Sequence, residues 1–178
     1  KITFPTFLNE GGNNVDPLKP SENPIPLEED EMAAILEYGG AFSKYFPNYE
    51  QRSQQIEMLR TVTTAFSKGK HMFIEAGTGT GKSFAYLIPA FHWAKQNGER
   101  VIVSTNTINL QEQLIRKDIP ELNNVLQEDF RAAVLKGRSN YLCPRRVQML
   151  HSHGVENADE LRVLSKVLVW LYEGGKGD

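Results

Sequence analysis

The feature that most constrains this chain is the glycine-rich run at residues 76–83, which reads Ala-Gly-Thr-Gly-Thr-Gly-Lys-Ser. Its glycines allow backbone angles that a β-carbon would forbid, so successive N–H groups can converge on phosphate oxygens. An apolar segment leads into the run and a helical pattern leads out of it, which is the context of a nucleoside triphosphate site. In such a site Lys82 neutralises the β- and γ-phosphates and Ser83 holds Mg²⁺.

One position departs from the general motif, Gly-x-x-x-x-Gly-Lys-[Ser/Thr], because Ala76 stands where the first glycine is expected. The alternative interpretation is a glycine-rich turn that joins a strand to a helix and binds nothing. We favour the phosphate site, with Lys82 and Ser83 as its catalytic residues. The predicted phosphate-binding residues are Ala76, Gly77, Thr78, Gly79, Thr80, Gly81, Lys82 and Ser83.

Strand and helix patterns alternate around this loop. The expected strands are 70–76, 100–105 and 131–135, and the expected helices between them are 81–96 and 110–116. Strands that alternate with helices indicate an α/β fold, in which helices flank a parallel sheet. Pro89 lies inside the first of these helices, where we expect it to kink or break the helix.

The flanking segments read differently. Residues 1–27 are rich in Pro, Gly and Asn and indicate a linker, with a possible short strand at 2–8. The remaining expected helices are 28–38, 50–68, 144–153 and 157–172. Asn157 and Glu160 have the spacing of a capping box, and the apolar face of the last helix is wide enough to suggest burial on more than one side.

Composition excludes several classes of protein. The 178 residues are 40% hydrophobic and 24% charged, which is ordinary for a folded domain and argues against wholesale disorder. No apolar run approaches the roughly 20 residues that span a bilayer, and no secretory signal is visible. The single cysteine excludes a disulfide framework and fits a reducing cytosol. We therefore predict a cytoplasmic protein without a membrane partner, and both chain ends look cut from something longer.

Charge is unevenly distributed along the chain. The net charge is −2, but the first fifty residues contain nine acids and only three bases. The rest of the chain is therefore basic overall and could face a polyanion.

Three segments resemble the first motor domain of superfamily 2 DNA helicases, in the DinG/XPD branch. They are Arg-Ser-Gln-Gln at 52–55, Glu-Ala-Gly-Thr-Gly-Thr-Gly-Lys-Ser at 75–83, and Leu-Lys-Gly-Arg-Ser-Asn-Tyr-Leu-Cys-Pro at 135–144. The resemblance covers roughly residues 45–147 and implies a P-loop NTPase (RecA-like) fold. The domains expected from it are an acidic linker with a short helix at 1–48, the N-terminal part of motor domain 1 at 49–142, and the start of a helical, iron–sulfur-type insert at 143–178.

The resemblance also implies binding of ATP and Mg²⁺. It makes Gln55 the residue that reads adenine, and a carboxamide suits that task because it offers both a donor and an acceptor. Arg52 is a weaker candidate for the same pocket. A glutamine on a helix is otherwise most often a solvated surface residue, so this assignment depends on the family likeness.

Two further segments are candidates for binding nucleic acid. Residues 104–107 resemble helicase motif Ia, in which Thr105, Asn106 and Thr107 would bond a DNA phosphate; the alternative is that Asn106 or Thr107 caps the next helix. Residues 131–151 contain five bases and no acid. There Arg138 and Tyr141 could attract and stack a single strand, whereas the alternative is a solvated basic surface.

Metal chemistry is restricted by the number of cysteines. The resemblance makes Cys143 the first of four thiolate ligands to a [4Fe–4S] cluster, but the chain has no other cysteine. Either the other three ligands lie beyond Asp178 or this branch lacks the cluster. His151 and His153 have no partner ligand at a suitable spacing, so we do not predict a metal site there.

The acid that positions the attacking water in these helicases belongs to an Asp-Glu-Ala-His sequence, which is not found in the chain. Asp159-Glu160 instead looks like the start of a helix. We expect this part alone to bind nucleotide weakly and to hydrolyse essentially none.

The parent is predicted to be an ATP-dependent DNA helicase that acts on single-stranded or forked DNA in repair. The family implies 5′→3′ movement and, in some members, an N-terminal exonuclease domain. The alternatives are a non-catalytic, nucleotide-gated module that regulates a linked exonuclease, and an RNA helicase of the same superfamily.

Overall fold

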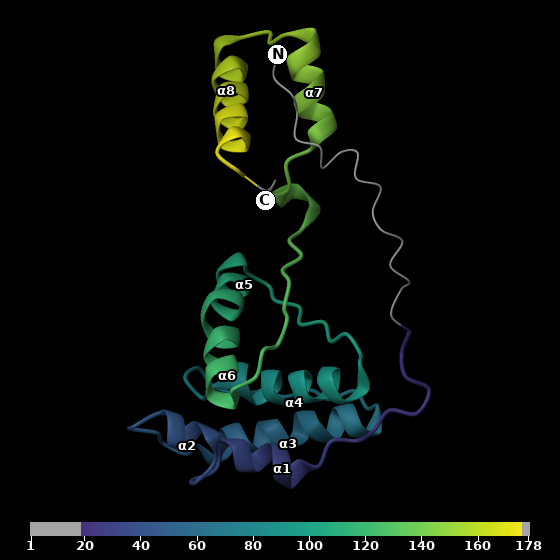
Figure 1. The fold of residues 1–178 in the computed structure, drawn as a ribbon, viewed down its shortest axis with the longest axis vertical. Coiled ribbons are helices and arrows are strands. Elements are labelled where there is room, and N and C mark those ends of the chain that lie inside the picture. Colours follow the sequence, from purple (N-terminus) through teal and green to yellow (C-terminus); the bar gives the residue numbers. More distant parts are fainter. Residues whose placement is uncertain (1–18, 176–178) are drawn as a thin grey trace. The chain divides into compact units, whose positions relative to one another are not determined.

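The computed structural model describes residues 19–175, which divide into two compact units. Residues 19–134 belong to one unit and residues 135–175 to the other. All regular secondary structure in these residues is helical (Figure 1). The possible strand at 2–8 lies outside the described residues.

The first unit is built around two long helices, α3 and α4, which pack along each other, with α1 packed against α3 (Figure 1). A π-helical turn, η2, joins the last two α-helices of this unit. The elements in chain order are α1 (Glu29–Leu36), α2 (Ala41–Tyr45), α3 (Ser53–Lys68), α4 (Lys82–Asn97), α5 (Ile108–Gln113), η2 (Leu114–Asp118) and α6 (Ile119–Leu126).

The core of this unit holds α3 and α4 in place. Leu59 of α3 and Leu87 and Ile88 of α4 are at most 2% exposed, and Phe66 stacks on Trp93 with ring centroids 5.5 Å apart. Fully burying one such aliphatic side chain stabilises a fold by about 1.5–3 kcal/mol. This packing fixes the two helices whose N-terminal ends approach the glycine-rich loop.

The helix ends that sequence reasoning predicted are largely confirmed. α3 ends at Gly69, which has φ 58° and ψ 36° and thus takes the left-handed conformation that terminates many helices. α1 ends before Gly39-Gly40, as expected. These stops depend on glycine and on local hydrogen bonds, so they can be predicted without knowledge of the tertiary structure.

The expected break at Pro89 does not occur, because α4 runs from Lys82 to Asn97 with the proline inside it. A proline at this position lacks the N–H that would bond the Ala85 carbonyl, so one intrahelical bond is missing. Pro89 is fully buried and its helical neighbours Leu87 and Ile88 belong to the core. Packing therefore holds the helix together across the missing bond.

The three expected strands are not present in residues 19–175. Segments 70–76, 100–105 and 131–135 have no regular structure, and most apolar side chains of the first two are exposed, with Phe73 fully exposed and Ile102 85% exposed. A strand exists only through hydrogen bonds to a neighbouring strand. No described segment supplies that neighbour, so the parallel sheet stays a prediction while the flanking helices are observed.

The second unit is a helical hairpin preceded by a short 3₁₀ turn. Its elements are η3 (Arg138–Asn140), α7 (Pro144–His153) and α8 (Ala158–Tyr172), and α7 packs on α8. The predicted cap of α8 is confirmed, because the Asn157 side chain accepts a hydrogen bond from the Glu160 N–H at 2.9 Å.

The expectation that α8 is buried on more than one side is wrong for the described residues. Among the residues of α8 only Leu164 is buried, whereas Leu161, Val163 and Val169 are each more than half exposed. A wide apolar face indicates which side chains could be buried, but burial also needs elements to cover them. Across residues 19–175 no helix has both the length and the apolar character needed to cross a membrane.

Candidate functional site

The glycine-rich loop leads directly into α4. Gly79 and Gly81 both have φ near +80°, in the left-handed region that side chains with a β-carbon rarely adopt. Gly81 is the N-cap of α4, and no side chain caps the first N–H groups of the helix there. Those N–H groups and the positive end of the helix dipole suit an anion. Two glycines of the loop thus have the backbone conformation that favours glycine, while phosphate binding by the loop stays a prediction.

Lys82, the first residue of α4, folds back over this loop. Its ammonium nitrogen donates to the carbonyl oxygens of Ala76 and Gly77, both at 2.8 Å. The Thr80 hydroxyl also donates to the Gly77 carbonyl, at 3.0 Å. An ammonium has three N–H donors, so these contacts hold the charge at the loop that it is predicted to serve.

The start of α3 also contacts the loop. The Gln55 side-chain nitrogen donates to the Gly81 carbonyl at 2.9 Å, and a guanidinium nitrogen of Arg52 donates to the Gly79 carbonyl at 2.5 Å. Gln55 is only 6% exposed. The structure thus brings both residues predicted for the adenine pocket against the phosphate loop. Sequence spacing placed them in one site but gave no sign of these carbonyl contacts.

Ser83, the predicted Mg²⁺ residue, lies in the first turn of α4, and Tyr86 follows it one turn later on the same helix. Burial raises the pKa of Tyr86, the nearby Ser83 side chain opposes that rise, and the Asp118 carboxylate adds to it. Sequence reasoning missed Tyr86, although its i, i+3 spacing from Ser83 was the available signal.

A buried carboxylate lies at the end of η2. Asp118 is 4% exposed and accepts a hydrogen bond from the Gln113 amide, with the shorter of two contacts at 3.1 Å. Burial of a carboxylate is costly unless it accepts hydrogen bonds, and Gln113 provides them. Neither residue was assigned a role from the sequence, and a π-helical turn has no simple sequence signal.

The segment that resembles motif Ia, residues 104–107, leads directly into α5. The Thr107 hydroxyl oxygen accepts a hydrogen bond from the Leu110 N–H at 3.2 Å, so Thr107 is the N-cap. The Thr105 hydroxyl donates to the Thr107 carbonyl, also at 3.2 Å. The capping role proposed as an alternative is therefore confirmed for Thr107, and no cap contact involves Asn106 in the described residues. DNA contact by Thr105, Asn106 and Thr107 stays a prediction.

In the second unit, Arg138 and Tyr141 lie in a tight turn. The Tyr141 phenol oxygen accepts a hydrogen bond from the Lys136 N–H at 2.8 Å, and the Asn140 N–H donates to the Gly137 carbonyl at 2.8 Å. Arg138 and Tyr141 are both exposed. The turn therefore presents a cation and an aromatic ring to solvent, as contact with a single strand would require.

The residues present do not fit an iron–sulfur cluster. Cys143 is exposed at the start of α7, the sequence has no second cysteine, and residues 19–175 contain no group of three or more metal-ligating side chains. A [4Fe–4S] cluster needs four ligands. Asp159 and Glu160 lie in the first turn of α8, where the Glu160 carboxylate accepts from the Glu156 N–H at 2.9 Å, so this Asp-Glu pair starts a helix, as predicted.

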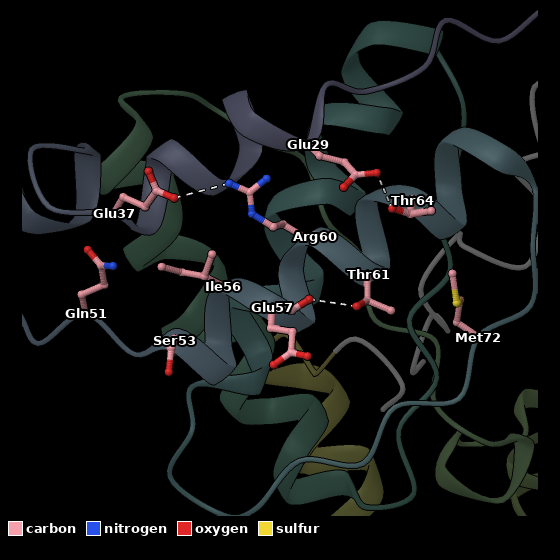
Figure 2. Close-up of a pocket in the computed structure, with 10 residues that line it drawn as sticks. All are labelled: Glu29, Glu37, Gln51, Ser53, Ile56, Glu57, Arg60, Thr61, Thr64 and Met72. Atoms are coloured by element: carbon pink, nitrogen blue, oxygen red, sulfur yellow. Dashed lines mark hydrogen bonds and ion pairs between the residues drawn. The ribbon is translucent and has the colours of Figure 1, made fainter.

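A separate groove of about 550 Å³ lies between α1 and α3 (Figure 2). It contains the carboxylates of Glu29, Glu37 and Glu57 but only one base, Arg60, which pairs with Glu37 at 3.5 Å and with Asp30 at 2.5 Å. No residue of the glycine-rich loop lines it. This charge balance would repel a triphosphate, so the groove is not the nucleotide site.

Comparison with known proteins agrees with the helicase resemblance of the sequence. Residues 52–149 match the family described as DEAD/DEAH box helicase. The chain is 39% identical over 138 residues to "3′-5′ exonuclease DinG" of Bacillus subtilis, an alignment that covers 78% of this chain and 15% of that protein.

Two further relatives carry helicase names. Identity is 43% over 142 residues with "ATP-dependent DNA helicase YoaA" of Escherichia coli K12, covering 78% of this chain and 21% of the relative. Identity is 46% over 101 residues with "ATP-dependent helicase DinG" of Mycobacterium tuberculosis H37Rv, covering 54% of this chain and 15% of the relative. The chain thus spans about a fifth or less of the length of these relatives.

Proposed function

Because this chain belongs to the DEAD/DEAH box helicase family and is DinG-like, we propose that it is the ATP-binding part of an ATP-dependent DNA helicase. The observation that carries the proposal is the loop at 76–83, where two glycines with positive φ lead into α4 and Lys82 lies over the loop. Hydrolysis of ATP would supply the free energy for movement along DNA.

In this proposal the loop residues bind the triphosphate. Main-chain N–H groups of residues 77–83 bond phosphate oxygens, and Lys82 exchanges its loop carbonyls for the β- and γ-phosphates. The Ser83 hydroxyl would hold Mg²⁺. The residues fit this assignment because a small hydroxyl and a long cation follow a loop that is free of bulky side chains.

Gln55 is proposed to read adenine while it keeps its contact with the loop. A carboxamide has two N–H groups and one carbonyl oxygen, and the contact with Gly81 uses one N–H. The second N–H and the oxygen stay available to the acceptor and donor on the edge of the base. Gln55 is buried, and a buried amide that lacks hydrogen-bond partners destabilises the protein, so its burial favours these contacts with the base.

The DNA-binding part of the proposal depends on Thr105, Asn106, Thr107, Arg138 and Tyr141. Short hydroxyl and amide side chains can bond phosphates without reading sequence, and an exposed arginine beside an exposed tyrosine suits a single strand. We propose single-stranded or forked DNA as the substrate and DNA repair as the setting. Two relatives, in Haemophilus influenzae and Escherichia coli, are named DNA helicases, which favours DNA over RNA.

A second candidate function has one specific observation in its favour. The Bacillus subtilis relative is named as a 3′-5′ exonuclease. The same ATP site could therefore gate a linked nuclease without driving unwinding.

The test uses the intact protein on forked DNA, on the matched RNA fork, and on labelled single strands. ATP-dependent separation of the DNA fork, abolished in the Lys82→Ala variant, is the expected result. Strand degradation that responds to ATP without separation of the fork would favour the gated nuclease. Separation of the RNA fork alone would favour the RNA helicase.

A further inference from the structure

The feature that suggests a further role is the pair of hydrogen bonds from the start of α3 to the phosphate loop. Arg52 bonds the Gly79 carbonyl and Gln55 bonds the Gly81 carbonyl. Gly79 and Gly81 are also the two loop glycines with positive φ. The two contacts therefore fall on the two peptides that set the shape of the loop.

These contacts determine where the loop N–H groups point. A trans peptide is planar, and its C=O and N–H groups point in opposite directions. When the Gly79 carbonyl faces Arg52, the N–H of Thr80 in the same peptide must face away from Arg52. When the Gly81 carbonyl faces Gln55, the N–H of Lys82 is directed away from Gln55 in the same manner. Both N–H groups belong to the set proposed to bind phosphate.

Arg52 is well anchored for this task. Its carbonyl accepts hydrogen bonds from the N–H groups of Gln55 and Ile56, at 3.0 and 3.2 Å, so its backbone is part of the first turn of α3. α3 is in turn fixed by buried Leu59 and Thr63. The guanidinium thus extends from a helix held by core packing to the Gly79 carbonyl, and the space where a β-carbon of Gly79 would lie is open.

We propose that Arg52 is a positioning residue for the phosphate loop and does not read adenine. Arginine has only donors, whereas recognition of the adenine edge needs both a donor and an acceptor. Its guanidinium donates to Gly79, and through that peptide it orients the Thr80 N–H. The proposal rests on the ATP-site assignment and adds that the contribution of Arg52 to binding is independent of the base.

A comparison of two ligands tests this role. Binding of ATP and of inorganic tripolyphosphate, which has no base, is measured by calorimetry in the intact protein. Arg52→Ala is expected to weaken both ligands by the same factor, about tenfold, because one charge-assisted hydrogen bond to the loop is lost. Gln55→Ala is expected to weaken ATP more than tripolyphosphate, because Gln55 also contacts the base.

Two further variants control the experiment. Arg60→Ala removes an arginine from the same helix, but Arg60 bonds Asp30 and Glu37 and not the loop, so both affinities should stay at the wild-type value. Arg52→Lys keeps a long cationic donor, so its affinities for both ligands should lie between those of Arg52→Ala and the wild type. If Arg52→Ala does not fold, the affinities of Arg52→Lys are compared instead. Equal losses of affinity for ATP and tripolyphosphate would support the positioning role, and a loss for ATP alone would contradict it.

Several outcomes would overturn the proposal. One is a loss of ATP affinity with unchanged tripolyphosphate affinity in Arg52→Ala, which would make Arg52 an adenine residue. Unchanged affinity for both ligands would also overturn it, as would a wild-type protein that binds ATP but not tripolyphosphate. A wild-type protein that binds neither ligand would contradict the ATP site itself, which is a separate failure.

Discussion

The side chain of Gln55 occupies the space that a β-carbon on Gly81 would need. Its nitrogen donates to the Gly81 carbonyl at 2.9 Å, and the same atom would lie 2.3 Å from that β-carbon. Gly81 also has φ +80°. Two independent constraints, the backbone conformation and the approach of Gln55, therefore require glycine at this position. The loop and α3 are fitted to each other at this point.

Gly81→Ala is expected to abolish detectable ATP binding and to destabilise the fold. A residue with a β-carbon in the left-handed region costs about 1–2 kcal/mol, and the collision with Gln55 adds to that cost. Urea denaturation gives the free energy of unfolding, and calorimetry gives the ATP affinity.

Gly98→Ala is the matched control for this variant. Gly98 ends α4 with φ +63° and has open space around it, so its substitution should cost only the backbone term and leave ATP affinity intact. Adding Gln55→Ala to Gly81→Ala should recover part of the stability by removing the collision. Equal destabilisation by Gly81→Ala and Gly98→Ala would show that the contact with Gln55 has no energetic weight.

Lys82→Ala is expected to reduce ATP affinity by at least about tenfold, because hydrogen bonds between charged groups contribute roughly 1.5–3 kcal/mol each. The measurement is calorimetric titration with ATP. Lys95→Ala is the control, since Lys95 is on the same helix but forms an ion pair with Glu128. Wild-type affinity in Lys82→Ala would refute the phosphate site.

The parts of the fold that could be predicted from sequence are those set by local chemistry. The end of α3 at Gly69 and the cap of α8 at Asn157 each depend on residues within one helical turn. The strands could not be established in this way, because Phe73 and Ile102 become buried in a sheet only when other strands pair with theirs.

In the candidate site, too, some features depend on local sequence and others on tertiary packing. The loop residues were predicted from a contiguous motif. The bonds from Arg52 and Gln55 to the loop depend on how α3 packs on α4, which is a property of the tertiary structure. The pairing of Asp118 with Gln113 also became visible only in the structure, because the π-helical turn between them has no simple sequence signal.

Arg138→Ala is expected to lower the salt dependence of binding to single-stranded DNA. Each phosphate contact contributes about 0.7 to the slope of log affinity against log salt, so the slope should fall by roughly that amount. The measurement is a fluorescence titration of the intact protein at several salt concentrations. Arg162→Ala is the control, because Arg162 is an exposed arginine on α8 outside the basic stretch. An unchanged slope in Arg138→Ala would remove Arg138 from the DNA surface.

His92 is expected to make the fold less stable in mild acid. Its Nε2 atom is buried without a hydrogen-bond partner among the described residues, and its ring lies edge-on to Phe130 with centroids 6.3 Å apart. Burial lowers the pKa of His92, and Lys95 lowers it further, while the carboxylates of Glu128 and Glu31 oppose the shift.

The direction of the pH effect follows from this lowered pKa. The unfolded chain takes up a proton on this imidazole near its ordinary pKa of about 6.5, whereas the folded protein takes it up only at lower pH. The contribution of His92 to stability is therefore complete above about pH 6.5 and is lost as the pH falls toward the folded value. Urea denaturation from pH 7.5 to 5.5 should show a smaller loss of unfolding free energy in His92→Phe than in the wild type. Parallel curves for the two proteins would mean that the buried imidazole does not control acid stability.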